Sequence, residues 1–185
     1  HRGREPISCR LVFDLLKTAG ADRIMSVDLH AAQSQGFFDG PVDHLIAMPV
    51  LVDYIRDRFQ GHLDNVAVVS PDAGRIRVAE QWAQRLGGGP LAFVHKTRDI
   101  TRPNQAVANR VVGDVAGKDC VLVDDLIDTA GTIAGACHVL QEAGAKSVTV
   151  VATHGVLSGP AIDRLKESGA REVVLTDTVP IPDEK

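Results

Sequence analysis

The sequence lacks the features that mark membrane proteins and nucleic-acid-binding proteins. No apolar run approaches the roughly 20 residues that cross a bilayer, and no signal peptide opens the chain. The net charge of −4 is small and has the wrong sign for binding nucleic acid through bulk electrostatics. We therefore expect a cytoplasmic protein that binds neither membranes nor nucleic acids.

Cysteine is scarce, and its three copies form no pattern. Cys9, Cys120 and Cys137 are odd in number and lack the spacing of a metal site, which argues against a disulfide framework. Cys120 opens a predicted strand and Cys137 falls in a helical pattern, so we expect both to be buried thiols. An initiator Met is absent too, because the chain starts at His1. We interpret the sequence as a piece of a longer protein, without its N-terminal part and extreme C-terminus.

What the chain does have is a globular composition and a regular alternation of strands and helices. Its 185 residues are 44% hydrophobic and 24% charged, enough for one ordinary domain or slightly more. From Val66 onwards, continuous Val-rich strands alternate with helical segments, which predicts an α/β fold with a parallel sheet and helices on both faces. We place a boundary near Gly61, with residues 1–60 as the remainder of an N-terminal domain and residues 61–185 as a C-terminal domain.

Apolar periodicity and glycine or proline breaks give the expected elements. Ser8 is expected to cap a first helix. The other helices are expected near 49–59, 75–86, 133–140 and 162–166, and the strands near 23–28, 66–69, 91–94, 108–112, 147–153 and 172–176.

One stretch combines the end of a strand, two acids and the start of a helix. Apolar residues 121–123 run into Asp124 and Asp125, after which residues 128–132 lead into a helical pattern. The first N–H groups of a helix lack partners and lie at the positive end of its dipole, which favours a phosphate there. Gly131 lets the backbone approach such a ligand, and the neighbouring threonines add hydroxyl donors.

The two acids narrow the type of ligand that this stretch would bind. Carboxylates beside a phosphate repel it unless they hold hydroxyl groups or a cation. A sugar phosphate satisfies both halves of the stretch. The simpler alternative is that Asp128 or Thr129 only caps the helix and that Asp124 and Asp125 end the strand in water.

The run of residues 121–132 resembles the ribose-phosphate loop of the phosphoribosyltransferase-like superfamily. The segment Asp28–Phe38 resembles the signature of ribose-phosphate pyrophosphokinases (phosphoribosyl pyrophosphate synthases), in which the His contacts the magnesium-nucleotide. Taken alone, His30 fits a satisfied loop histidine more simply than a ligand. The match of the whole segment separates a family that makes phosphoribosyl pyrophosphate from the families that consume it.

Two further segments are similar to the same family. Residues 69–74 resemble its pyrophosphate-facing loop, where Asp72 would be the second magnesium-linked residue. The alternative for Asp72 is a turn residue after a proline. Residues 95–98 resemble the start of the flexible catalytic loop, which carries Lys96 and Arg98; the alternative is a solvated charge cluster.

The resemblance implies a phosphoribosyltransferase-like fold and a transferase that moves the diphosphoryl group of Mg-ATP to the C1 hydroxyl of ribose 5-phosphate. It implies Mg²⁺ as cofactor, ATP as substrate and a hexamer as the assembly. The family's upstream nucleotide motifs are absent from the sequence, so we expect residues 1–185 alone to be inactive. The implied site residues are Lys96 and Arg98 for catalysis; Arg98, Asp124, Asp125, Asp128, Thr129, Ala130, Gly131 and Thr132 for ribose 5-phosphate; and His30 and Asp72 for the metal.

Two other classes of protein remain open. A phosphoribosyltransferase would share residues 124–132 but would consume phosphoribosyl pyrophosphate together with a base. It gives no reason for the match over residues 28–38. A regulatory paralogue would assemble with the synthase without catalysing the reaction, but it has no need to retain Lys96 and Arg98.

Overall fold

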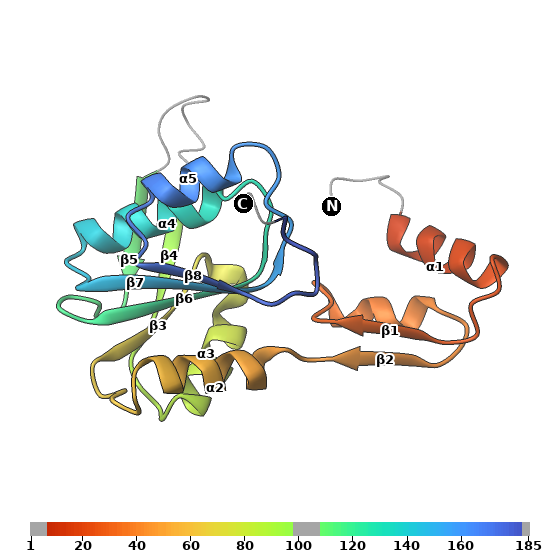
Figure 1. Ribbon diagram of the computed structural model, residues 1–185, viewed down its shortest axis with the longest axis horizontal. Coiled ribbons are helices and arrows are strands. Elements are labelled where there is room, and N and C mark those ends of the chain that lie inside the picture. The colour runs from red at the N-terminus through yellow and green to blue at the C-terminus, as the bar shows by residue number, and fades with distance from the viewer. Residues whose placement is uncertain (1–6, 98–107, 183–185) are drawn as a thin grey trace. The chain divides into compact units, whose positions relative to one another are not determined.

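The computed structural model describes residues 7–97 and 108–182, and the chain divides into two compact units (Figure 1). The division falls between Ala47 and Met48. It lies earlier in the chain than the boundary expected near Gly61. None of the helices in the described part of the chain has the length and hydrophobicity that a bilayer-crossing segment needs.

Helix α2 (Met48–Arg58) explains why the division lies before Met48 and not near Gly61, because its side chains bond to residues near the C-terminus of the second unit. The Tyr54 hydroxyl donates to one carboxylate oxygen of Glu172 at 3.0 Å, and Nε of Arg58 donates to the other at 3.0 Å. The sequence places α2 upstream of the alternating pattern, but these long-range contacts assign it to the C-terminal unit.

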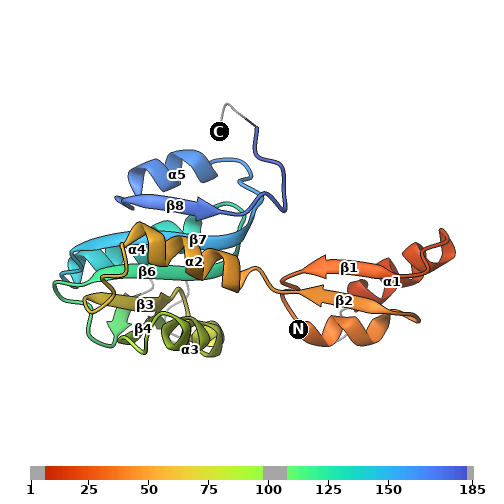
Figure 2. The same cartoon turned by 60° about the horizontal axis from the view of Figure 1, so that its bottom comes forward.

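The first unit contains a helix, two short strands and a 3₁₀ helix. These elements are α1 (Ser8–Thr18), β1 (Ile24–Val27), η1 (Ala32–Phe37) and β2 (Val42–Leu45). Strands β1 and β2 pair in parallel (Figure 2), and the rings of Phe13 and Phe38 pack with centroids 6.1 Å apart. The expected cap at Ser8 is wrong, because α1 already begins at Ser8, and Ile7, at the cap position, makes no side-chain cap bond.

The second unit is built on a six-stranded sheet in the order β5-β4-β3-β6-β7-β8. After α2 its elements are β3 (Val66–Ser70), η2 (Ala73–Arg75), α3 (Ile76–Arg85), β4 (Leu91–Thr97), β5 (Ala108–Val112), β6 (Asp119–Ile127), α4 (Gly131–Glu142), β7 (Ser147–Gly155), α5 (Ala161–Glu167) and β8 (Glu172–Leu175).

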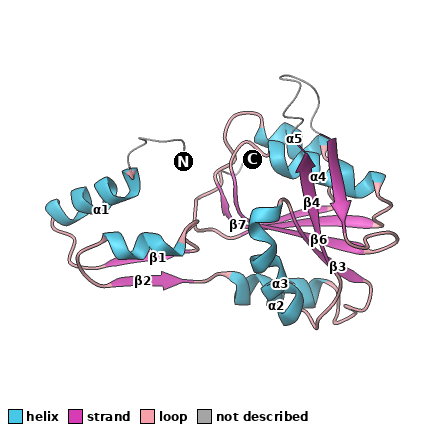
Figure 3. Ribbon diagram, turned by 180° about the vertical axis from the view of Figure 1, so that it is seen from behind, coloured by secondary structure: helices cyan, strands magenta, loops and turns pink. Residues whose placement is uncertain are grey.

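Helices cover both faces of this sheet, as the sequence predicts. Helices α2 and α3 lie on one face and α4 and α5 on the other (Figure 1). Every neighbouring pair of strands is parallel except β4 and β5, which pair antiparallel at one edge (Figure 3). Strand β6 has a neighbour on each side, β3 and β7, so the turn that follows it lies in the middle of the carboxyl edge of the parallel strands.

The core of the second unit forms where the two helical layers meet the Val-rich strands. Every residue of β3 is buried, and so are the first five residues of β6 and the central residues of β7. The expected burial of Cys120 and Cys137 is confirmed, since both are fully buried. Burial raises the pKa of the Cys120 thiol to about 12 and that of Cys137 to about 11, so both remain protonated.

Candidate functional site

The turn between β6 and α4 presents the start of a helix without a side-chain cap. Ala130, which has a left-handed backbone with φ of 58°, occupies the cap position and makes no side-chain cap bond. The alternative in which Asp128 or Thr129 caps this helix is therefore not observed. The first N–H groups of α4 keep the capacity to bind an anion.

Contacts on the protein side hold the backbone of this turn. The N–H of Ser158 donates to the carbonyl of Asp128 at 3.0 Å, and Nη1 of Arg164 donates to the carbonyl of Thr129 at 2.9 Å. Ala130 is buried, whereas Asp128, Thr129, Gly131 and Thr132 are exposed. The turn is thus anchored through its carbonyls and through Ala130, while the groups expected to bind a phosphate face solvent.

Asp124 and Asp125 lie within strand β6 instead of after it, because the strand continues to Ile127. Both carboxyls are largely buried and share one cation, Arg75. Nε of Arg75 lies 3.3 Å from Oδ1 of Asp124, and its Nη2 donates to Oδ2 of Asp125. The side chains of Arg75, Asp124 and Asp125 are 17%, 14% and 12% exposed.

The proximity of two buried carboxyls changes how easily they ionise. Burial, together with the Asp125 carboxyl beside it, raises the pKa of Asp124 to about 7, although Arg75 acts in the opposite direction. Near neutral pH, Asp124 can therefore donate a hydrogen bond as well as accept one. Such a pair is suited to hold hydroxyl groups, which also donate and accept.

Asp72 begins the short turn that carries Arg75. Its Oδ1 accepts the N–H of Gly74 at 2.8 Å, and its carbonyl accepts the Ser70 hydroxyl at 2.6 Å. The turn role that the sequence left open for Asp72 is thus present. Its carboxylate is only partly buried, so bonding to Gly74 is compatible with a further ligand.

His30 belongs to the first unit, in the exposed bend that follows β1. The backbone turns sharply at Asp28, where φ is 43°, and Oδ2 of Asp28 accepts the N–H of Ala47 at 3.2 Å. Nε2 of His44 accepts the N–H of Leu29 at 2.9 Å. The bend that carries His30 is therefore braced by β2 and its end.

The catalytic pair expected from the sequence is only partly within the described residues. Lys96 is in β4, where its backbone is opposite Asn109 of β5. Arg98 lies outside the described residues. Across residues 7–97 and 108–182, no three His, Cys, Asp or Glu side chains gather as a metal site.

The sequence did not single out Arg75 or His44, which support the candidate residues. Both act through long-range contacts, to β6 in one case and to the bend after β1 in the other. The only available signal for Arg75 was its position three residues after Asp72. Without the order of the strands in the sheet, the sequence does not show that β3 and β6 are neighbours, so it gives little reason to place Arg75 beside Asp124 and Asp125.

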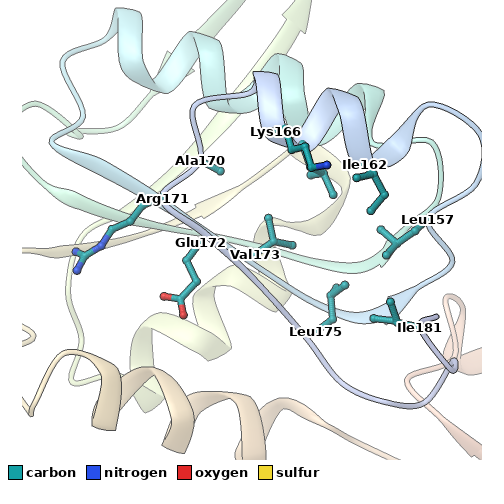
Figure 4. Close-up of a pocket in the computed structure, with 10 residues that line it drawn as sticks. Leu157, Ile162, Lys166, Ala170, Arg171, Glu172, Val173, Leu175 and Ile181 are labelled. Carbon is teal, nitrogen blue, oxygen red and sulfur yellow. The ribbon is translucent and has the colours of Figure 1, made fainter. Parts of the chain in front are cut away.

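Two apolar grooves border the edge strand β8, away from these residues. One, of about 530 Å³, lies between β8 and α5, and Figure 4 shows Leu157, Leu175 and Ile181 gathered at one end of it. The other, of about 510 Å³, is lined by residues of α2 and by the segment 173–177. Neither is lined by Asp124, Asp125 or the 128–132 turn, so neither is part of the candidate site.

Comparison with known proteins identifies relatives over the whole chain. Residues 92–185 match the family model described as phosphoribosyl synthetase-associated domain. A ribose-phosphate pyrophosphokinase of Bifidobacterium longum is 96% identical over 185 residues, which is all of this chain and 54% of that protein. The chain therefore spans about half the length of the curated relatives that it matches.

Solved structures agree with this finding. The crystal structure of phosphoribosylpyrophosphate synthetase from Mycobacterium smegmatis superposes with a TM-score of 0.91 at 63% identity, covering 100% of this chain and 58% of that one. Orotate phosphoribosyltransferase from Aeropyrum pernix superposes with a TM-score of 0.52 at 25% identity, covering 70% of this chain and 72% of that one. The α/β fold of the phosphoribosyltransferase type, expected from the sequence, is thereby confirmed.

Proposed function

This chain belongs to the family of the phosphoribosyl synthetase-associated domain, and on that premise we propose that the protein is a ribose-phosphate pyrophosphokinase. The proposed reaction transfers the diphosphoryl group of Mg-ATP to ribose 5-phosphate. The C1 hydroxyl oxygen bonds to the β-phosphorus of ATP, the bond from that phosphorus to the AMP oxygen breaks, and the hydroxyl proton is released. The products are phosphoribosyl pyrophosphate and AMP. The 96% identity to a ribose-phosphate pyrophosphokinase of B. longum supports this assignment.

The observation that carries the proposal is the uncapped start of α4 next to a largely buried pair of carboxyls. In the proposal, Asp128, Thr129, Ala130, Gly131 and Thr132 bind the 5-phosphate, as the exposure of the turn and its anchored backbone allow. The carboxyls of Asp124 and Asp125 bind ribose hydroxyls, and Arg98 assists in binding the sugar phosphate. A phosphate alone would not need these two acids.

The metal proposal rests on the chemistry of Asp72 and His30. Mg²⁺ prefers oxygen ligands and is commonly held by one or two carboxylates together with substrate phosphates, so a single Asp72 fits without a larger cluster. Imidazole is a poorer ligand for Mg²⁺ than carboxylate is. We therefore propose that Asp72 holds the magnesium-bound pyrophosphate through the metal and that His30 holds it through the phosphates. Bound Mg²⁺ would neutralise charge on the transferred group.

Lys96 and Arg98 supply cationic charge in the proposed transfer. Phosphoryl transfer depends mainly on positioning and on electrostatic stabilisation of the transferred group. Lys96 leads from β4 directly into the segment that holds Arg98, so both belong to one stretch of chain. The hexamer implied by the resemblance remains part of the proposal and is measurable by light scattering on the purified protein.

The test is an assay of the purified full-length protein, because residues 1–185 alone are expected to be inactive. It measures AMP formation from Mg-ATP that depends on ribose 5-phosphate. We expect AMP and phosphoribosyl pyrophosphate to appear in equal amounts. A phosphoribosyltransferase would instead consume phosphoribosyl pyrophosphate in the presence of a base, and that result would overturn the proposal. A regulatory paralogue would give neither reaction alone but would change the activity of a separate synthase.

A further inference from the structure

Arg75 occupies a position that its sequence neighbours do not explain. Strand β3 pairs with β6 only from Val66 to Val69, which lies opposite Leu122. Asp124 and Asp125 therefore extend beyond the β3 ladder. The turn after β3 brings Arg75 to this flank, where one guanidinium bonds to both carboxyls.

This arrangement is unusual for two consecutive residues of a strand. Successive side chains of a strand point to opposite faces, so two adjacent acids do not normally share a partner. The planar guanidinium carries several N–H donors in a fixed fork, and here Nε meets Asp124 while Nη2 meets Asp125. A Lys side chain would bring the same charge without this fixed geometry.

We propose that Arg75 is a positioning residue that fixes the carboxyls of Asp124 and Asp125 in the orientation that receives the ribose hydroxyls. The inference rests on the proposed function, since it concerns the same sugar site. Arg75 also joins the Asp72 turn to the end of β6, because it closes the 3₁₀ helix that begins directly after Asp72. Arg75 therefore links Asp72, which is proposed to hold magnesium-bound pyrophosphate, to Asp124 and Asp125, which are proposed to hold the sugar.

The expected consequence is selective for the sugar. Without the fork, the two carboxyls lose a charge-assisted contact worth about a ten- to hundredfold change in an equilibrium constant. Arg75→Lys and Arg75→Gln should therefore raise KM for ribose 5-phosphate about tenfold or more. The values of kcat and of KM for ATP should change less than about threefold, because Arg75 is not proposed to contact the reacting atoms.

The experiment is steady-state kinetics on the full-length protein and on its variants Arg75→Lys, Arg75→Gln and Arg77→Gln, with folding checked by circular dichroism. Arg77 is an exposed arginine two residues further along, so its variant controls for loss of a nearby charge. If Arg75→Gln fails to fold, the Lys variant still tests the geometry. Equal effects at Arg75 and Arg77, or a loss in kcat with unchanged KM for the sugar, would overturn the inference.

A double-mutant cycle with Asp125→Asn tests whether Arg75 acts through the carboxyls. The loss in ribose 5-phosphate affinity caused by Arg75→Gln should shrink when Asp125 is already Asn, because one of the two carboxylate contacts of Arg75 has then already been removed. Additive losses would contradict the inference. The wild-type assay separates the two levels: if the unmodified protein forms AMP with ribose 5-phosphate, the proposed function stands whatever the Arg75 variants do, and if it does not, both fail.

Discussion

Replacing Asp124 by Asn should change how the stability of the protein depends on pH. The ordinary pKa of an Asp carboxyl, 3.8, is raised to about 7 at Asp124, mainly by burial. Between these two values the folded protein keeps a proton that the unfolded chain has lost, so the free energy of unfolding falls as pH rises. Across the whole interval from 3.8 to about 7, the free energy of unfolding falls by about 4 kcal/mol. Asn cannot ionise and resembles the protonated acid, so its variant lacks this loss.

The measurement is urea unfolding of the wild type and of Asp124→Asn from pH 5 to pH 8. Over that range the stability of the variant relative to wild type should rise by about 3 kcal/mol, which is the part of the window between pH 5 and a pKa of about 7. Contributions of titrating groups that do not contact Asp124 cancel in the difference, whereas the adjacent carboxyl of Asp125 contributes to it. Asp114→Asn is the control, because it makes the same substitution at a side chain that is 74% exposed.

Parallel pH profiles for Asp124→Asn and the wild type would refute the reasoning. They would mean that Asp124 is already ionised at pH 5 in the folded protein. The attraction of Arg75 would then outweigh both the burial of Asp124 and the repulsion from the acid beside it. A rise of the expected size only for Asp124→Asn would establish that burial and the neighbouring acid together outweigh Arg75 at this site.

Three further substitutions test the fold and the site. Lys96→Ala should lower kcat by about a hundredfold or more and change KM for ribose 5-phosphate only a few-fold, since Lys96 is proposed to stabilise charge during transfer; equal losses in both would contradict that role. Gly113→Ala should lower the melting temperature more than Gly117→Ala. A Cβ at Gly113, where φ is 114°, would lie 2.7 Å from a β4 carbonyl oxygen, whereas at Gly117 it meets no atom within 4 Å. Leu122→Ala should lower the free energy of unfolding in urea by about 2–5 kcal/mol, because Leu122 is fully buried. Leu126→Ala should lower it by less than about 1 kcal/mol, because Leu126 is 40% exposed. Similar values for the two variants would contradict the assigned core.

Elements with local signals were predicted well from the sequence. The apolar run at Val66 became β3, the segment 108–112 became β5, and Gly144 follows the end of α4. These predictions succeed because strand and helix periodicity and glycine breaks act over a few residues. The α/β class follows from the alternation of such elements.

Features that depend on distant contacts were not predicted. The antiparallel pairing of β4 and β5 is invisible in the sequence, because apolar runs carry no information about direction. Ser8 has the chemistry of a cap, yet the helix already begins there, because helix ends are poorly fixed by local patterns. The assignment of α2 to the second unit depends on Glu172, which follows it by more than a hundred residues.

The candidate site also combines residues whose role is visible locally in the sequence with supporting residues that come from distant segments. The supporting residues affect how tightly the site binds its ligand. Residues 128–132 were recognised from the sequence because their chemistry is local: a helix start, a glycine and hydroxyls. What holds the turn is not local, since its carbonyls are bound by Ser158 and Arg164 from the segment after β7. A turn anchored in this way needs little further ordering when a phosphate binds, and less free energy of binding is then spent on fixing the loop. The same reasoning applies to Asp124 and Asp125, whose shared cation comes from the turn after β3. The sugar-binding half of the site is therefore preorganised by the two segments that flank it, and its affinity should depend on Arg75 and Arg164 as well as on the residues that touch the ligand.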